Sequence, residues 1–183
     1  MNCKHSPKLS LCIVMVAAAW LSSNEPTMSA ENPTPTDTPS LEYVMTVKAT
    51  IEPAVEMGKT PEGQRRVIPI SGGTFEGPGL KGIIMPGGED WQLVRDDGTM
   101  LLEARYWLRT EDGTIIRVHN AVTISAQAAT EQKPASRYVR SSVKFEAPVG
   151  KYDWFNKAIF VGTLRADTTQ RPAVVTLQFY KVI

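Results

Sequence analysis

Residues 90–125 read DWQLVRDDGTMLLEARYWLRTEDGTIIRVHNAVTIS. Three runs of aliphatic, aromatic and β-branched residues are separated by two turns, Asp96-Asp97-Gly98 and Glu111-Asp112-Gly113. Asp-Gly supplies the positive φ that tight hairpin turns require. The segment therefore predicts a three-stranded antiparallel meander whose register is fixed by these turns.

The same pattern extends in both directions from this meander. Apolar residues recur with a period of two from Leu41 onward, and turn residues interrupt them at intervals of about ten residues. Further strands are expected at 41–53, 65–71, 74–75, 80–85, 137–147, 158–166 and 173–182. No segment has the pattern of a long helix, so we expect an all-β fold, a single antiparallel β-barrel of about eight or nine strands. Its topology is expected to be lipocalin-like or porin-like, but soluble, and a two-sheet sandwich is the alternative.

Residues 1–30 have the three parts of a secretory signal peptide. A basic start is followed by an apolar stretch from Leu9 to Leu21 and then by small residues. Because this stretch is shorter than the roughly 20 residues that a membrane-spanning helix needs, we expect a removed signal. Cleavage is expected after Ala30 or at an earlier position, and the predicted localisation is secreted or periplasmic.

The rest of the chain divides into a linker and one domain. Residues 31–40 are rich in Pro, Thr and Ser and are expected to be a disordered linker. Residues 41–183 are expected to be the β-barrel domain, since about 140 residues is an ordinary size for one domain.

The composition after residue 30 excludes several kinds of chemistry. Cys3 and Cys12 lie in the leader, and His119 is the only histidine beyond it. One imidazole without a thiol cannot supply a typical zinc site, so neither a metal nor a cofactor is expected.

The charge balance bears on partners. Removing residues 1–30 takes two of the 20 basic and one of the 19 acidic residues, which leaves 18 of each. The chain then has no net charge to attract nucleic acid or an anionic membrane. The expected partner is a small-molecule ligand, with no nucleic acid and no membrane after signal removal, and homo-oligomers are left open.

Residues 100–110 place different side chains on their two faces. One face carries the apolar positions and Tyr106, and the other carries Glu103, Arg105 and Trp107. The polar face is either a solvated surface, where an ion pair contributes little, or the lining of a barrel mouth that binds a polar ligand. Similar mixtures recur at Arg137, Tyr138, Arg140 and Glu146, and at Tyr152, Asp153, Trp154 and Asn156.

The glycine-rich stretch 71–82, SGGTFEGPGLKG, is typical of bulges and sharp bends between strands. It lacks the Gly-Lys-Ser/Thr ending and the following helix of a phosphate-binding loop. For acid/base chemistry, the candidate bases are Asp90, Glu103 and Glu146, and the candidate polarising partners are Arg105 and Tyr106.

Several ordered motifs resemble the domain of unknown function 3237 family. They lie at 71–77, 82–91, 103–106, 137–140, 152–156 and 159–162, and the resemblance extends from about Leu41 to the end. It implies a compact antiparallel β-barrel with mostly bacterial and fungal members and no settled common activity. Members are commonly leaderless, so the signal peptide is a departure that places this chain outside the cytoplasm.

The resemblance also bears on the candidate site. It implies that the family's recurrent polar and aromatic positions correspond here to Asp90, Trp91, Glu103, Arg105, Tyr106, Arg140, Glu146, Tyr152, Trp154 and Asn156. We expect Asp90, Glu103, Arg105 and Tyr106 to be catalytic. The ligand-binding residues are then expected to be Trp91, Arg140, Glu146, Tyr152, Trp154 and Asn156.

Two hypotheses of function follow from these residues. The first is an exported small-molecule enzyme that uses cofactor-independent acid/base chemistry, as an isomerase, lyase or hydrolase, on a small cyclic or aromatic metabolite in the barrel mouth. The alternative is a periplasmic ligand-binding or protein-interaction module without catalysis. Convergence of the candidate residues in one buried pocket favours the enzyme.

Overall fold

The computed structural model describes residues 37–130 and 134–183, which form one ten-stranded antiparallel sheet. The expectations for residues 1–30 and for 31–36 of the linker lie outside the described residues. The elements are β1 (Leu41–Ile51), β2 (Val55–Thr60), β3 (Gly63–Gly77), β4 (Leu80–Ile84), β5 (Gly88–Val94), β6 (Met100–Thr110), β7 (Ile115–Gln127), β8 (Ser136–Glu146), the 3₁₀ helix η1 (Asp153–Lys157), β9 (Phe160–Asp167) and β10 (Ala173–Val182).

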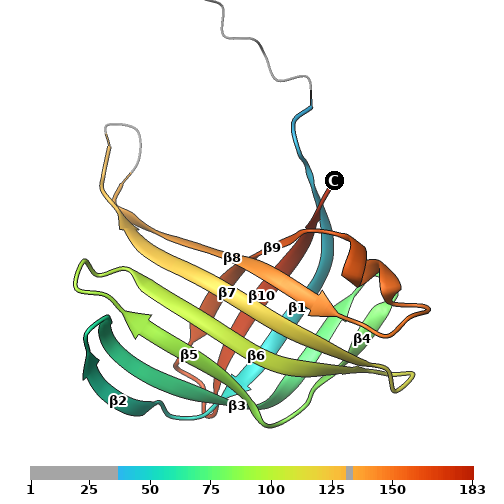
Figure 1. The fold of residues 1–183 in the computed structure, drawn as a ribbon, viewed down its shortest axis with the longest axis horizontal. Coiled ribbons are helices and arrows are strands. Elements are labelled where there is room, and N and C mark those ends of the chain that lie inside the picture. The colour runs from blue at the N-terminus through green and yellow to red at the C-terminus, as the bar shows by residue number, and fades with distance from the viewer. Residues whose placement is uncertain (1–36, 131–133) are drawn as a thin grey trace, which may run out of the picture. The chain divides into compact units, whose positions relative to one another are not determined.

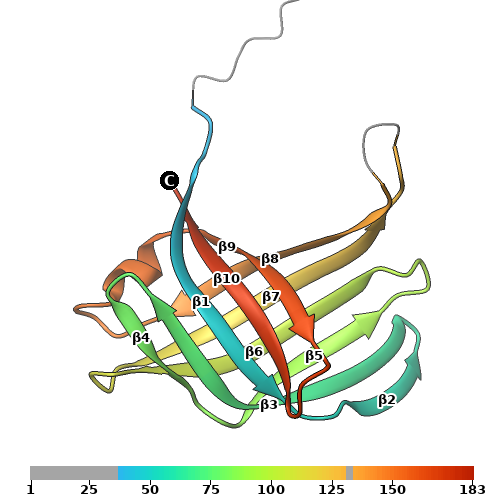
Figure 2. The same ribbon diagram turned by 180° about the vertical axis from the view of Figure 1, so that it is seen from behind.

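The sheet closes into a barrel, which confirms the predicted fold class. Each strand from β5 to β9 pairs with the next along the chain, and β1 closes the ring by pairing with both β10 and β3 (Figures 1 and 2). Strands β4 and β5 share one position between β3 and β6, and β2 pairs with β3 beside the ring. The ring therefore has eight strand positions, because β2 lies outside it and β4 and β5 count as one position. This arrangement is an up-and-down barrel topology like that of lipocalins.

The predicted turns of the central meander are present. Gly98 and Gly113 have φ angles of 80° and 84°, the left-handed conformation for which Asp-Gly turns are suited. Between these turns, β6 begins at Met100 and ends at Thr110, as the sequence predicts.

Three local features differ from the predicted elements. The runs 65–71 and 74–75 are parts of the single strand β3, in which Ser71 is an extra residue relative to β1. The short strand β2 and the helix η1 were not predicted, because VEMGKT and DWFNK carry no apolar periodicity.

No helix within residues 37–130 and 134–183 is long and apolar enough to cross a membrane.

Aromatic side chains fill one end of the barrel, here called the plugged end. Phe145 contacts Phe155 of η1 with ring centroids 4.6 Å apart, and Phe160 with centroids 4.9 Å apart. Phe155, Phe160 and Phe179 are almost fully buried. Helix η1 thereby seals the end at which β8 finishes and β9 begins.

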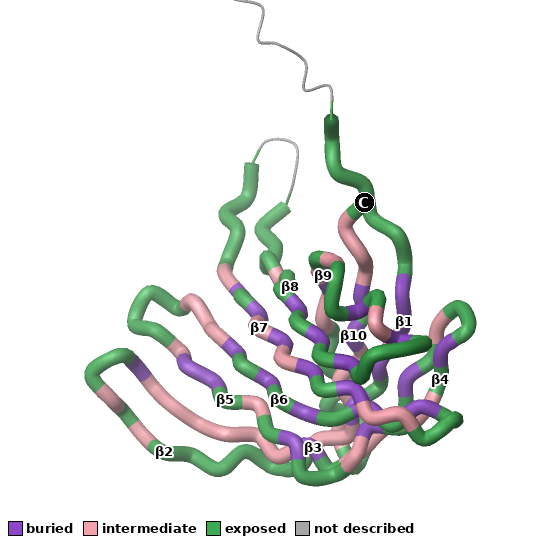
Figure 3. Tube along the Cα trace, turned by 45° about the vertical axis from the view of Figure 1, so that its right-hand side comes forward, coloured by how far each residue is buried: buried purple, intermediate pink, exposed green. Residues whose placement is uncertain are grey.

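The other end, here called the open end, is less tightly closed. Strands β8 and β9 pair only over 141–143 and 160–162, whereas β8 begins at Ser136 and β9 continues to Asp167. Buried and exposed positions alternate along β6, β7 and β8 in Figure 3, as expected of a wall with one side facing the interior. Side chains near the open end, such as Leu164 and Val175, are only partly buried.

Candidate functional site

A bulge in the barrel wall precedes Asp90. Five steps along β4 and β5, from Ile84 to Glu89, face three steps along β6, from Leu108 to Arg105. Bulges redirect the side chains that follow them. Here the Asp90 side chain lines the barrel interior.

A close approach of two strands follows the same bulge. A Cβ atom on Gly88 would lie 2.7 Å from Cβ of Tyr106, a separation that real Cβ atoms essentially never show. Glycine at this position therefore lets β5 pack directly against Tyr106.

Four polar side chains lie on the inner face of four neighbouring strands. Asp90, Ala104, Asn120 and Val143 lie opposite one another across β5, β6, β7 and β8. Tyr106 follows Ala104 by two residues and Ser141 precedes Val143 by two, so both share the inner face. We call Asp90, Tyr106, Asn120 and Ser141 the interior polar cluster.

The interior polar cluster is short of hydrogen bonds. Among the residues that the structure describes, the buried atoms Asp90 Oδ1, Tyr106 OH, Ser141 Oγ and both Oδ1 and Nδ2 of Asn120 have no hydrogen-bond partner. Buried polar atoms in folded proteins are usually paired, so a set of such atoms at one place requires an explanation.

Asp90, Tyr106 and Asn120 line one interior cavity of about 40 Å³. Its other lining residues are apolar, namely Ala49, Ile51, Ile70, Leu102, Ala104, Val122, Leu164, Val175 and Leu177. A single water needs about 10–15 Å³ on this scale, so the cavity holds a few non-hydrogen atoms. Ile51, Leu164 and Val175 are partly exposed and continue the apolar lining toward the open end.

A hydrogen-bonded chain connects Asp90 to the open end. Gln92 Nε2 donates to Oδ2 of Asp90 at 2.6 Å, and Arg66 Nε donates to Oε1 of Gln92 at 2.9 Å. Arg66 Nη1 lies 3.8 Å from Oε1 of Glu56 on β2. The buried carboxyl group is thus held from one side by polar residues on the inner face.

Burial changes the acidity of two cluster members. Loss of water around Asp90 raises the pKa of its carboxyl group, while the Gln92 hydrogen bond and the positive charge of Arg66 act in the lowering direction and are smaller. Burial, and then the negative charge of Asp90, raises the pKa of Tyr106 far above its ordinary value. Tyr106 therefore remains a hydrogen-bond donor at neutral pH.

Five of the predicted site residues lie on the outer face of the barrel. They are Trp91, Glu103, Arg105, Arg140 and Glu146. The side chains of Glu103 and Arg105 are 57% and 58% exposed, and their charged groups are 3.8 Å apart. The alternation predicted for β6 is present, but its polar face points to solvent and does not line the barrel mouth.

The predicted residues on this outer face contact other side chains at the surface. His119 Nε2 lies 3.9 Å from Oε2 of Glu103, and Arg117 pairs with Glu146 at 2.9 Å. Arg140 lies over the ring of Tyr138, with 5.7 Å from Cζ to the centroid. These contacts are separate from the interior polar cluster.

The remaining predicted residues, Tyr152, Trp154 and Asn156, lie at the plugged end. Tyr152 OH donates to Oδ2 of Asp112 at 2.9 Å. Asn156 makes two hydrogen bonds with the backbone of Ala147, at 2.9 Å and 2.8 Å, and so ties η1 to the end of β8.

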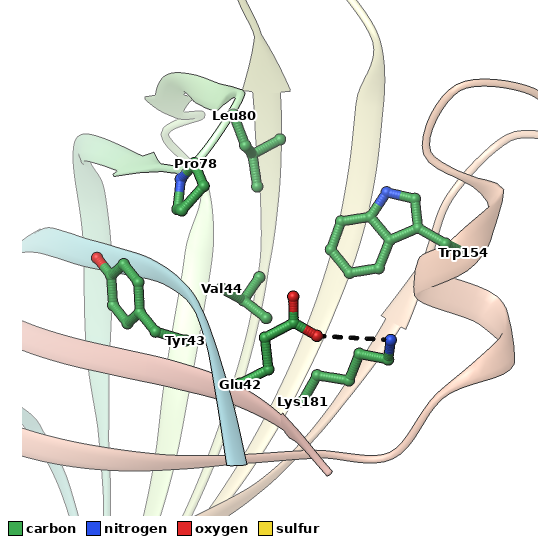
Figure 4. Close-up of a pocket in the computed structure, with 7 residues that line it drawn as sticks. All are labelled: Glu42, Tyr43, Val44, Pro78, Leu80, Trp154 and Lys181. Atoms are coloured by element: carbon green, nitrogen blue, oxygen red, sulfur yellow. Dashed lines mark ion pairs between the residues drawn. The ribbon is translucent and has the colours of Figure 1, made fainter. Parts of the chain in front are cut away.

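Trp154 borders a surface groove at the same end. Its ring stacks on Phe155 with centroids 3.9 Å apart. Trp154, Tyr43, Pro78 and Leu80 line a groove of about 250 Å³. Figure 4 shows the indole facing this groove. An ion pair of 3.7 Å between Lys181 and Glu42, which lie opposite each other on β10 and β1, forms part of its lining.

Asn120, Ser141 and Gln92 were not predicted as site residues. A signal for the first two was present in the sequence, because each interrupts an apolar face of its strand. Asn120 lies between Val118 and Val122, and Ser141 lies between Val139 and Val143.

No group of three or more His, Cys, Asp or Glu residues within 37–130 and 134–183 is arranged to hold a metal ion.

Comparisons with known proteins extend along the whole barrel. The model of the family described as Protein of unknown function (DUF3237) matches residues 39–182. A UPF0311 protein of Rhodopseudomonas palustris is 35% identical over 136 residues, which are 69% of this chain and 89% of that protein. The hydroalkoxylation enzyme phnH of Penicillium herquei is 28% identical over 137 residues, 75% of this chain and 80% of that protein.

A solved structure agrees with the described fold. The crystal structure of a β-barrel-like protein from Acinetobacter baumannii has a TM-score of 0.69 to this chain and is 31% identical. The match covers 84% of this chain and 99% of that one.

Proposed function

The chain belongs to the DUF3237 family, and we propose that it is an enzyme that acts without a cofactor on a small, largely apolar metabolite inside the barrel. Asp90 is the general acid and base in this proposal. Tyr106 and Asn120 bind polar atoms of the substrate, and the apolar lining binds its carbon skeleton.

The observation that carries this proposal is that three members of the interior polar cluster, Asp90, Tyr106 and Asn120, line one otherwise apolar cavity. Each buried polar atom that lacks a partner destabilises the fold by about 1–3 kcal/mol, whereas an apolar residue of similar shape would not. Residues with such unpaired atoms around one cavity destabilise the ligand-free protein. They are typical of a site where a bound ligand supplies the missing partners.

The environment of Asp90 suits proton transfer. A carboxyl group exchanges protons most effectively when its pKa lies near the working pH, and burial moves Asp90 in that direction. Tyr106, as a buried neutral donor, suits the stabilisation of negative charge that develops on a substrate oxygen. Both groups line the same cavity.

The fungal relative suggests a class of reaction. Hydroalkoxylation adds the O–H bond of an alcohol across a carbon–carbon double bond, so that an ether forms. In such a step here, the substrate oxygen forms a C–O bond and loses its proton, while the other alkene carbon gains a proton from Asp90. The hydroxyl proton restores Asp90, so the step needs no co-reactant, and isomerisations through an enol use the same groups.

The proposal includes export of this enzyme. Support for export comes from the signal-peptide pattern of residues 1–30. An exported enzyme would act on a metabolite that is present outside the cytoplasm.

Proton transfer to carbon can be tested without knowing the natural substrate. The protein is incubated in deuterated water with a panel of aryl ketones and allyl-substituted phenols, and mass spectrometry measures deuterium gained at carbon. We expect the wild type to label at least one compound and Asp90→Asn to label it at least about 100-fold more slowly. Glu89→Gln is the matched control, because Glu89 adjoins Asp90 but is exposed on the outer face.

Two results would overturn the proposal. Equal labelling by the wild type and Asp90→Asn would remove Asp90 from the chemistry. Binding of panel compounds in the cavity without any labelling would favour a ligand-binding module instead.

A further inference from the structure

We infer that Asn120 recognises a hydroxyl group next to a carbonyl group, so that the substrate class is neutral hydroxy-carbonyl compounds. This inference deepens the proposed function and rests on it. It assigns to Asn120 a role in substrate specificity.

Asn120 is buried between apolar residues of the two neighbouring strands. Asn120 is 1% exposed, and the residues opposite it on β6 and β8 are Ala104 and Val143. Within the described part of the chain, neither Oδ1 nor Nδ2 finds a partner. The amide lines the cavity, so a bound molecule can reach both atoms.

The amide requires a donor and an acceptor from the same molecule. Oδ1 only accepts and Nδ2 only donates. A lone hydroxyl can serve both atoms only through one oxygen and therefore with bent hydrogen bonds, whereas a donor and an acceptor on neighbouring atoms give each amide atom its own partner. A hydroxyl beside a carbonyl and a lactam both have this pattern, whereas a plain ketone, ether or alkene leaves one amide atom unpaired.

Charge and chemistry select among these groups. A carboxylate is excluded because it offers only acceptors and would bring negative charge close to Asp90 in an apolar cavity. A lactam has no hydroxyl for the addition reaction or for conversion to an enediol. Of the groups that give each amide atom its own partner, the hydroxy-carbonyl group also fits the proton transfer assigned to Asp90.

The size of the cavity agrees with this assignment. A volume of about 40 Å³ holds a head group of a few atoms but not a whole aromatic ring. The hydroxyl and carbonyl then occupy the deep cavity with Asn120, Asp90 and Tyr106. The remaining carbon skeleton extends along Leu164 and Val175 toward the open end.

The test compares three compounds that differ at one position. α-Hydroxyacetophenone carries the donor and acceptor, acetophenone lacks the hydroxyl and α-methoxyacetophenone lacks its proton. Dissociation constants are measured by isothermal titration calorimetry for the full chain. We expect the wild type to bind the hydroxy ketone about tenfold more tightly than either analogue.

Variants assign the preference to one residue. Asn120→Leu, which keeps the approximate shape, is expected to bind all three compounds within about twofold of one another. Asp90→Asn is expected to keep the tenfold preference while losing deuterium labelling. In nuclear magnetic resonance spectra, the side-chain NH₂ signal missing from Asn120→Leu is expected to shift in the wild type when the hydroxy ketone is added.

The outcomes separate this inference from the proposed function. An equal preference in Asn120→Leu, no preference in the wild type, or no binding of α-hydroxyacetophenone overturns the inference about Asn120. A preference that depends on Asn120 without any labelling supports the inference and overturns the proposed enzyme. Labelling that depends on Asp90, without a preference for the hydroxy ketone that depends on Asn120, supports the proposed enzyme and overturns the inference about Asn120.

Discussion

Gln92 donates a hydrogen bond of 2.6 Å to Oδ2 of Asp90, and this contact orients the buried carboxyl group. The amide of Gln92 has one orientation, because its Oε1 accepts from Arg66, which can only donate. The second oxygen of Asp90, Oδ1, is left for the cavity. Gln92 is therefore a positioning residue for the proposed acid/base group.

Replacing Gln92 is expected to change the pH dependence of the reaction. The Gln92 hydrogen bond lowers the pKa of Asp90, so Gln92→Leu should raise that pKa further. The limb of the pH–rate profile that reports Asp90 should move to higher pH, as measured by deuterium labelling across a pH series. A profile with an unchanged limb and a uniformly lower rate would show that Gln92 only supports the fold.

Asp90→Asn is expected to alter stability in a pH-dependent way. The folded pKa of Asp90 is raised above its ordinary value of 3.8, so the folded state favours the neutral carboxyl group. Below about pH 3.8 the group is neutral in both states, and this stabilising contribution is lost as the pH rises through the folded pKa. The Tm of Asp90→Asn, relative to that of the wild type, should therefore rise from about pH 3 to about pH 7.

Thermal unfolding followed by circular dichroism at several pH values measures this difference. Glu89→Gln, on the exposed face of the same strand, should show no comparable trend. A constant difference across the whole range would contradict a raised pKa for Asp90.

The sequence was sufficient for much of the fold. Asp-Gly turns and strict alternation fixed both ends of β6, where packing of Leu102, Ala104 and Leu108 follows the predicted apolar face. Strand β2 has only six residues, VEMGKT, and its pairing with β3 depends on tertiary structure.

The candidate site was predictable only in part. Asp90 and Tyr106 were expected, but their meeting with Asn120 depends on the register across β5, β6 and β7. The bulge after Ile84 sets that register for β5, and periodicity alone does not reveal a bulge. The polar face with Glu103 had the residue types of a site, but only the closed barrel shows that this face is outside.

Asn120→Leu is expected to stabilise the ligand-free protein. The substitution removes a buried amide that lacks partners among the described residues and keeps a similar volume. The free energy of unfolding should rise by about 1 kcal/mol or more, as measured by urea denaturation. Thr123→Leu, on the outer face of the same strand, should change it by no more than about 0.5 kcal/mol.

A loss of stability in Asn120→Leu would carry a different meaning. The amide would then contribute to the fold, for example through buried water. Such a result would contradict a role for Asn120 that only a substrate satisfies.

Export predicts a shortened chain. Expression of the full sequence in a Gram-negative host should give a mature protein in the periplasm, whose N-terminus is identified by mass spectrometry. We expect that terminus at residue 31 or at an earlier position within 19–31, because small residues suitable for cleavage lie there. A full-length protein that stays in the cytoplasm would contradict export and leave the proposals about the barrel unchanged.

The location of a bound ligand tests the central claim most directly. Crystals soaked with α-hydroxy-4′-bromoacetophenone would give an anomalous signal from bromine. The account predicts bromine near the open end of the barrel, with the hydroxyl and carbonyl within about 3.2 Å of the Asn120 amide. Bromine in the groove beside Trp154, elsewhere outside the barrel, or absent at saturating concentration would contradict it.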